Sequence, residues 1–268
     1  MNLRDATIVP VTMPDVQGSE DKRNIAITRV GIKGLRYPLI FAGQPSVAEF
    51  KMTVALPASQ KGTHMSRFLA LLEGHNESLD VAAFGRMHTE MLALLHADEG
   101  SLEASFPMFV RKKAPVTGVA SLMDYTVKIV IDGSVTNATT HLQILVPVTS
   151  LCPCSKTVSD YGAHNQRSHL TVSVSSPVST MAVAPQTLID IAESQASSEL
   201  YGLLKRADEK FVTELAYDNP KFVEDLVRDV AAELKSLQVQ SMISSWQVEA
   251  ENFEAIHNHS AYALISSD

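Results

Sequence analysis

Long stretches in which apolar and polar residues alternate constrain the fold of this chain more than any other feature of its sequence. One such stretch has apolar residues at Met123, Tyr125, Val127, Ile129 and Ile131. Successive side chains of a strand point to opposite faces of a sheet, so this period of two predicts a strand with one buried face. Asp132-Gly133 is a typical hairpin signal, and the alternation resumes after it at Leu142, Ile144, Val146 and Val148. The two segments predict long antiparallel strands joined by a hairpin.

Strand and helix patterns follow the same order in the two halves of the chain. In the first half, two strand patterns precede two helical patterns, at about 24–34, 50–56, 65 onward and 79–97. In the second half, helical patterns at about 185–197 and from Asn219-Pro220 lie between strand patterns at about 170–174, 246–250 and 262–264. Asn is a good helix cap and Pro suits the first helical position. The sequence therefore predicts an α+β fold with a mostly antiparallel sheet, built from two strand–strand–helix–helix–strand–strand modules.

The expected boundaries follow from this order. Residues 1–23 lack periodicity and are interpreted as an N-terminal arm. The first module is expected to span 24–132 and the second 133–268. Both cysteines fall in the second module, which is therefore expected to carry most of any metal site.

Composition excludes several classes of protein. The chain has 268 residues, 45% of them hydrophobic, and a formal net charge of -8. An acidic chain lacks the basic face that nucleic acid requires, so no nucleic-acid partner is expected. No apolar run reaches the ~18 residues that span a bilayer, and the first residues contain no apolar signal segment. We therefore expect a soluble, cytoplasmic protein with no membrane partner.

The two cysteines lie directly after the second predicted hairpin strand, as Cys152-Pro153-Cys154. A disulfide between them would close a strained ring, so free thiols or a metal ligand are the better interpretation. Cys-x-Cys alone is a weak metal signal, and two small buried residues at a strand end are the plain alternative. His164 follows nearby in the polar loop Gly-Ala-His-Asn-Gln-Arg at 162–167. A thiolate beside an imidazole is a plausible start for a transition-metal site.

Carboxylates further along the chain could complete such a site. The charged run 205–210 is interpreted as a cluster between helices. Such a run usually forms a solvated face. One carboxylate from it could instead join Cys and His as a metal ligand and leave a coordination position open for water. Glu224 and Asp225 fall in the first turn of the helix expected from Pro220, where the helix dipole favours them. Glu224 lies at the margin of the apolar stripe, so we expect it to be partly buried and able to accept two N–H bonds from a guanine-like edge.

Two further segments combine histidine with charge. Glu254, His257 and His259 lie between the last two strands, where imidazoles could transfer protons or have no role at all. The segment 61–67, Lys-Gly-Thr-His-Met-Ser-Arg, precedes a helix and could bind an anion, although it is also an ordinary helix start.

Taken together, these motifs resemble one family, the type IB GTP cyclohydrolases of the tunnelling fold. The resemblance runs from Pro-Asp-Val-Gln at 14–17 to His-Asn-His at 257–259, nearly the whole chain. It is carried by the segments 61–67, 152–154, 162–167, 205–210 and 219–225. The family resemblance implies a bimodular tunnelling fold whose antiparallel sheets close into barrels in a homotetramer, with active sites at subunit interfaces. It also implies hydrolysis of GTP to formate and 7,8-dihydroneopterin triphosphate, the first step of tetrahydrofolate biosynthesis, with a divalent metal such as Mn²⁺, Zn²⁺ or Fe²⁺.

Individual roles are expected from the same resemblance. The metal ligands would be Cys152, His164 and Glu209, although whether Cys152 or Cys154 binds the metal stays open. Cys152, His257 and His259 would be catalytic, with water attacking C8 of the guanine and histidine protonating the opening ring. The remaining expected contacts are with substrate, from Glu224, Glu254, Lys61, His64 and Arg67.

Three alternatives remain at this stage. A non-catalytic purine- or pterin-binding module of the same fold would keep Glu224 without an open metal position. A related tunnelling-fold enzyme would reduce a nitrile or act on a pterin. A purely structural metal site is the weakest alternative, because such sites usually have four Cys or His ligands.

Overall fold

The computed structural model describes residues 14–267. Its strands are β1 (Ile27–Phe41), β2 (Gln44–Leu56), β3 (Ser78–Leu79), β4 (Glu99–Lys113), β5 (Ala120–Ser134), β6 (Ala138–Leu151), β7 (Asn165–Pro177), β8 (Ser198–Glu199), β9 (Ser245–Asn252) and β10 (Ala261–Ser266). Its helices are α1 (Met65–Glu73), α2 (Val81–Leu95), α3 (Pro153–Val158), α4 (Pro185–Ser194), α5 (Arg206–Asp218) and α6 (Val223–Val239). None of these helices is both long enough and apolar enough to cross a membrane.

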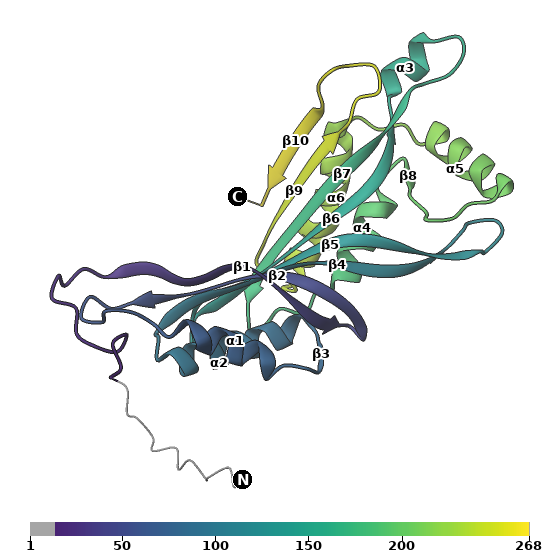
Figure 1. Ribbon diagram of the computed structural model, residues 1–268. Coiled ribbons are helices and arrows are strands. Elements are labelled where there is room, and N and C mark those ends of the chain that lie inside the picture. Colours follow the sequence, from purple (N-terminus) through teal and green to yellow (C-terminus); the bar gives the residue numbers. More distant parts are fainter. Residues whose placement is uncertain (1–13, 268) are drawn as a thin grey trace, which may run out of the picture.

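The strands form one sheet in the order β10-β9-β7-β6-β5-β4-β2-β1-β3, and β8 pairs with β6 (Figure 1). All pairings between the long strands are antiparallel. The first half of the chain supplies β1, β2, β4 and β5 with α1 and α2, and the second supplies β6, β7, β9 and β10 with α4, α5 and α6. The predicted α+β class and mostly antiparallel sheet are confirmed, and the second half adds helix α5 to the expected strand–strand–helix–helix–strand–strand order.

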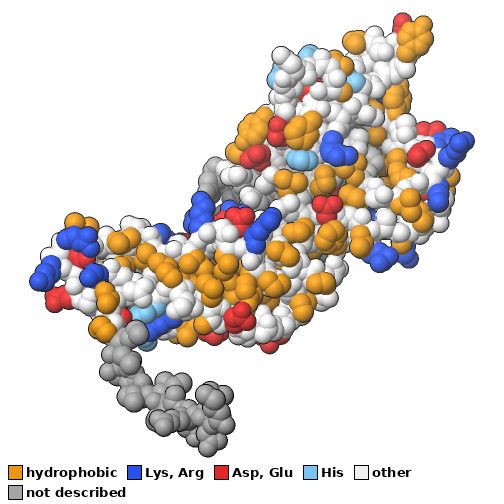
Figure 2. Space-filling model, in the orientation of Figure 1, with side chains coloured by type: hydrophobic (Ala, Val, Ile, Leu, Met, Phe, Trp, Pro, Cys, Tyr) orange, Lys and Arg blue, Asp and Glu red, His pale blue; other side chains and the backbone are white. Residues whose placement is uncertain are grey.

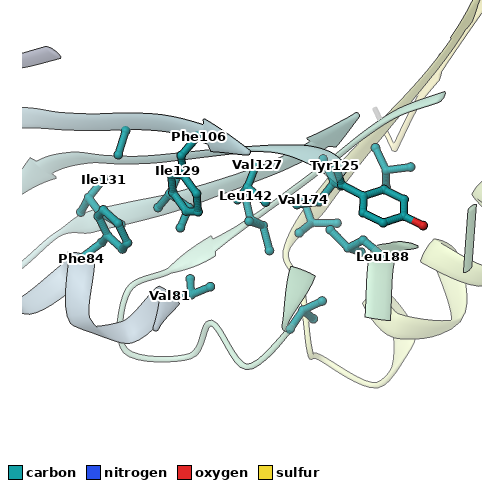
Figure 3. Close-up of a cluster of buried hydrophobic side chains, with 14 of the residues drawn as sticks. Val81, Phe84, Phe106, Tyr125, Val127, Ile129, Ile131, Leu142, Val174 and Leu188 are labelled. Carbon is teal, nitrogen blue, oxygen red and sulfur yellow. The ribbon is translucent and has the colours of Figure 1, made fainter. Parts of the chain in front are cut away.

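One face of the sheet carries the core. Helix α2 packs on β4 and β5, while α4 packs on β6 and β7 and α6 on β9 and β10. The alternating positions of the central strands point toward these helices and are fully buried, for example Val127, Ile129 and Leu142 (Figure 3). The period-two pattern thus placed the correct side chains inside, because only one face of the sheet is covered by helices.

Two local expectations were wrong in detail. Strand β5 continues through Asp132 and Gly133 to Ser134, so the turn lies at 135–137 and not at Asp132-Gly133. The last helix begins at Val223, and Asn219 instead ends α5, where its Nδ2 donates to the Ala196 carbonyl at 2.8 Å. Asn-Pro fits both a helix start and a helix end, since Pro220 cannot continue α5.

The strands β5 and β6 separate toward one end of the sheet. Their pairing runs from Gly133↔Ala138 only as far as Thr126↔Leu145, and beyond that point β6 pairs with β8. The end of β6 therefore projects away from the β4–β5 hairpin, together with α3 and the β9–β10 loop (Figure 1). This projecting end carries the cysteines.

Candidate active site

Cys152 and His164 are brought together where β6 leads into α3 and the chain returns to β7. The last residue pair of the two strands is Leu151↔Asn165, and the Cys152 amide donates to the His164 carbonyl at 3.1 Å. Ser155 secures the same turn, since its Oγ donates to the Cys152 carbonyl at 3.0 Å and accepts from the His164 amide at 3.2 Å. The expected proximity of the cysteine loop and His164 therefore follows from strand pairing.

The two thiols differ in their surroundings. Cys152 is half-buried and caps α3, and its Sγ accepts a hydrogen bond from the Ser155 amide at 3.5 Å. Cys154 is exposed, within the first turn of α3. Both are free thiols, and only Cys152 belongs to the turn that holds His164.

The His164 side chain has one ring nitrogen engaged. Its Nδ1 lies 3.0 Å from Oε1 of Gln166, two residues further along the chain. A carbonyl oxygen can only accept, so Nδ1 is the donor in this contact, and in the neutral ring Nε2 is then the nitrogen with the lone pair. A histidine in this state suits metal ligation through Nε2.

The β9–β10 loop lies at the same end of the molecule. The Phe253 amide donates to the Arg167 carbonyl at 3.0 Å, which fixes the start of the loop beside β7. Glu254 is half-buried, whereas His257 and His259 are exposed, with ring centroids 5.1 Å apart and nearly parallel. Histidine side chains are visible at this end in the space-filling view (Figure 2). Imidazole is a common proton-transfer group, and these two are accessible to a bound molecule.

Glu224 stands at the start of α6, next to the end of β6. The Lys221 amide donates to the Leu151 carbonyl at 3.1 Å and so ties the segment before the helix to the cysteine strand. Glu224 itself is exposed, contrary to the expectation of partial burial. The stripe facing the sheet is formed by Val223, Leu226 and Val227, which leaves Glu224 on the outer side of the first turn.

The charged run 205–210 is the start of helix α5 and not a cluster between helices. Its fully buried carboxylate is Asp208, which accepts from the amides of Val116, Thr117 and Lys205 at 2.8–2.9 Å and from the Thr117 hydroxyl at 2.6 Å. Burial alone would raise the pKa of Asp208, but these donors outweigh it and hold the pKa well below its usual range. Asp208 therefore joins α5 to the β4–β5 hairpin and is not available as a metal ligand, while Glu209 is exposed.

The three expected metal ligands do not form one group within a single chain. Among residues 14–267, no three His, Cys, Asp or Glu side chains are arranged to hold a metal ion. Cys152 and His164 share one turn, whereas Glu209 lies on α5 beside Asp208, whose carboxylate binds the β4–β5 hairpin. The thiol of Cys152 and the imidazole of His164 are donor types that fit a metal ion at two positions.

Lys61, His64 and Arg67 lie in the other half of the fold. Helix α1 packs against α2 and β1 and is far from α3 (Figure 1). Arg67 donates to the Leu94 carbonyl at 2.7 Å, and His64 Nε2 lies 3.0 Å from Oδ1 of Asp15. The loop before α1 also pairs with residues near the start of the described chain. The Gly62 amide donates to the Gln17 carbonyl and the Lys61 amide to the Ser19 carbonyl, and Glu20 and Gln60 form a β-bridge. Within one chain these residues do not meet the cysteine loop.

Sequence reasoning missed Gln166 as part of the site. It is 8% exposed although it is polar, and it lies on the buried face of β7 together with Ser168 and Leu170. A polar amide at an inward position of an alternating strand needs a hydrogen-bond partner. That signal was present in the sequence, at a spacing of two from His164.

Comparison with known proteins identifies the family to which this sequence belongs. The family model described as "Type I GTP cyclohydrolase folE2" matches residues 13–263. The chain is 56% identical over its full length to the GTP cyclohydrolase FolE2 of Janthinobacterium sp. (strain Marseille), covering 98% of that protein. It is 57% identical over 96% of its length to the corresponding protein of Herminiimonas arsenicoxydans, covering 97% of it.

Similar solved structures are more distant. A hyperthermostable mutant of Bacillus sp. TB-90 urate oxidase gives a TM-score of 0.44 at 10% identity, over 90% of this chain and 99% of that one. Uricase from Arthrobacter globiformis gives a TM-score of 0.41 at 10% identity, over 89% of this chain and 92% of the uricase chain. Because the family match and the relatives cover nearly the whole sequence at more than half identity, the chain belongs to the type I GTP cyclohydrolase FolE2 family.

Proposed function

We propose that this protein hydrolyses GTP to formate and 7,8-dihydroneopterin triphosphate, the entry reaction of tetrahydrofolate biosynthesis. Family membership supports the reaction. The observation that carries it in the structure is the turn that holds Cys152 beside His164, with Nε2 of His164 left free. A thiol and an imidazole with a free lone pair are donors of a catalytic metal site.

Type I GTP cyclohydrolases generally depend on a metal. In this protein Cys152 and His164 would hold a divalent ion such as Mn²⁺, Zn²⁺ or Fe²⁺, with Glu209 as the third protein ligand. Bound there, the ion would supply an activated water for hydration of the guanine at C8. Since Glu209 does not join the other two ligands in the described chain, we propose that the set is completed in a homotetramer with active sites at subunit interfaces.

The side chains around this centre would bind and orient the substrate. Exposed Glu224, anchored near Leu151 by the Lys221 amide, would accept the N–H groups of the guanine edge and position the ring. Glu254 would contact the substrate beside Glu224. His257 and His259 would donate the proton that a ring nitrogen needs as the imidazole ring opens.

The triphosphate requires cations. We propose that Lys61, His64 and Arg67 of a second copy supply them, because in one chain these residues lie far from the cysteine loop (Figure 1). In this arrangement the first module (24–132) contributes phosphate contacts, and the second module (133–268) contributes most of the metal site.

One assay tests the proposal. Metal-free protein is mixed with GTP and titrated with Mn²⁺, Zn²⁺ or Fe²⁺ singly, and formate and pterin fluorescence are both measured. We expect both products in equal amounts with at least one ion, and an unchanged circular dichroism spectrum after chelation. Binding of GTP without formate release would instead identify a non-catalytic purine-binding module.

A further inference from the structure

A chain of buried hydrogen bonds runs inward from His164 across β6 and β7. Nδ1 of His164 lies 3.0 Å from Oε1 of Gln166, and Nε2 of Gln166 donates to Oγ of Ser150 at 2.8 Å. Ser168 Oγ donates to the same Ser150 oxygen at 2.8 Å. Gln166 is 8% exposed, and both serines are fully buried. The chain therefore leaves the half-exposed site and ends in the interior of the sheet.

The register of the sheet fixes this arrangement. Ser150 and Gln166 are direct partners across β6 and β7, so their side chains leave the same face at short separation. Gln166 has a donor and an acceptor on one rigid amide. With its N–H₂ directed to Ser150, its oxygen is held toward the imidazole.

The orientation of that amide decides which histidine nitrogen is free. A carbonyl oxygen against Nδ1 requires an N–H there, and Nε2 is then left as a base directed away from the network. In free histidine the proton is not fixed on either nitrogen. A second contact that selects one tautomer and one ring orientation is the usual support for a metal-binding imidazole.

We propose that Gln166, held by Ser150, is a positioning residue that keeps His164 in the Nδ1–H tautomer and so presents Nε2 to the metal. The proposal rests on the proposed function in one respect, that His164 ligates the metal of the site. Gln166 itself touches neither metal nor substrate in this scheme. Apart from strand pairing, the side chains of Gln166 and Ser150 bind one another, His164 and Ser168.

The sheet contains a matched control. Gln143 on β6 donates through Nε2 to Ser173 Oγ on β7 at 3.0 Å, and these two residues are also direct cross-strand partners. The Gln143 pair therefore has the same residue types, strands and bond as the Gln166 pair but no contact with His164, and it lies half-buried on the opposite face of the sheet. Gln143→Met and Gln166→Met remove the same chemical group at two places.

The tautomer is tested first, on metal-free protein. Long-range ¹H–¹⁵N spectra of ¹⁵N-histidine-labelled protein distinguish protonated from unprotonated ring nitrogens, and His164→Gln assigns the signal among the nine histidines. We expect His164 to be protonated at Nδ1 in the wild type and in Gln143→Met, and to shift toward Nε2–H in Gln166→Met. Nε2–H in the wild type would overturn the proposal.

Metal affinity is tested next, by competition of Zn²⁺ between the protein and a chromophoric chelator. Loss of such a supporting contact weakens metal binding by roughly 10–100-fold. We expect that loss for Gln166→Met and no loss for Gln143→Met. Gln166→Glu keeps an acceptor opposite Nδ1 and should restore most of the affinity, whereas a purely structural role predicts no such rescue.

The outcomes separate this proposal from the proposed function. If Gln166→Met unfolds, Ser150→Ala takes its place in both measurements. That variant keeps Gln166 and removes only the hydroxyl that accepts from its side-chain amide. Wild-type affinity in the folded variants would exclude a positioning role even if GTP is hydrolysed. Conversely, absence of GTP turnover in wild-type protein would remove the proposed function, while the tautomer and zinc measurements would still test Gln166.

Discussion

The two halves of the sheet repeat one order of elements but use their helices differently. In the first half, α2 buries most of its length, including Phe84, Met87 and Met91, against β4 and β5. In the second half, α6 covers the sheet in the same way, but α5 buries only Asp208 and Ala216. The helix that carries Glu209 is therefore held chiefly by hydrogen bonds to a hairpin and by few apolar contacts.

This difference shows how a repeated module can divide its tasks. The first half closes its loops on itself, as when Arg67 binds the end of α2. The second half leaves Cys152, Glu224 and the β9–β10 loop at an open end of the sheet, on a rigid support. We therefore expect substitutions in the core of the first half to affect stability, and substitutions at the open end to affect chemistry.

The largest effect is expected for Cys152→Ala. Removing the thiol should lower turnover of GTP by roughly a thousandfold or more, a rise in barrier of about 4 kcal/mol. The melting temperature should change little, because Cys152 is half-buried and lies in a surface turn. Formate release and thermal unfolding measure the two effects. Cys154→Ala is the comparison, and wild-type turnover in Cys152→Ala would remove this thiol from the mechanism.

Phe84→Ala should show the reverse behaviour in the first half. Phe84 is fully buried, with its ring centroid 6.4 Å from that of Phe41 and 6.3 Å from that of Phe106. The cavity should lower the free energy of unfolding by about 3–5 kcal/mol, measured by urea denaturation. Turnover per folded molecule should persist at low temperature. Loss of activity without loss of stability would contradict the division between the halves.

Glu224→Gln should weaken GTP binding without affecting the fold. If a charge-assisted hydrogen bond to the guanine edge is lost, affinity should fall by about 2 kcal/mol, measured by calorimetry. Glu233→Gln is the control, since Glu233 is an exposed glutamate on the same helix. Equal affinity of the two variants would assign Glu224 to the helix terminus alone.

Asp208→Asn should reveal a pH-dependent contribution to stability. The pKa of Asp208 is lowered in the folded protein, so its contribution is present above the unfolded value, about 3.9, and is lost as the pH falls toward the folded pKa. The variant should have a lower melting temperature than the wild type at neutral pH, and the difference between the two melting temperatures should decrease as the pH is lowered. Melting curves between pH 7 and strongly acid buffer measure it. A gap independent of pH would show that the carboxylate charge contributes nothing.

The smallest effect is expected for Phe211→Ala on α5. This ring is 43% exposed and should contribute within about 0.5 kcal/mol to the stability of the single chain. Denaturation of dilute protein measures it, alongside Phe84→Ala as the buried counterpart. A loss as large as that of Phe84→Ala would show that the face of α5 is covered in solution.

Much of the fold could be predicted from the sequence, because the strands have one covered face and their alternation is therefore clear. The meeting of Cys152 and His164 also followed from sequence, since both flank strands that pair. Helix α5 was missed because its charged start was interpreted as a solvated cluster, although Phe211, Val212 and Leu215 follow at helical spacing. The exposure of Glu224 and the distance of Arg67 from the cysteines depend on tertiary packing, which a local pattern does not encode.

The spacing of two between His164 and Gln166 has a consequence for how this site can change over generations. Extended chain repeats its direction every second residue, so the pair shares one side of the ribbon only while the segment keeps its length. Inserting or deleting a single codon there would turn one partner outward, whereas exchanging the side chain of Asn165 between them would leave the spacing intact. We therefore expect relatives that keep this pair to differ here by replacement and not by a change of length.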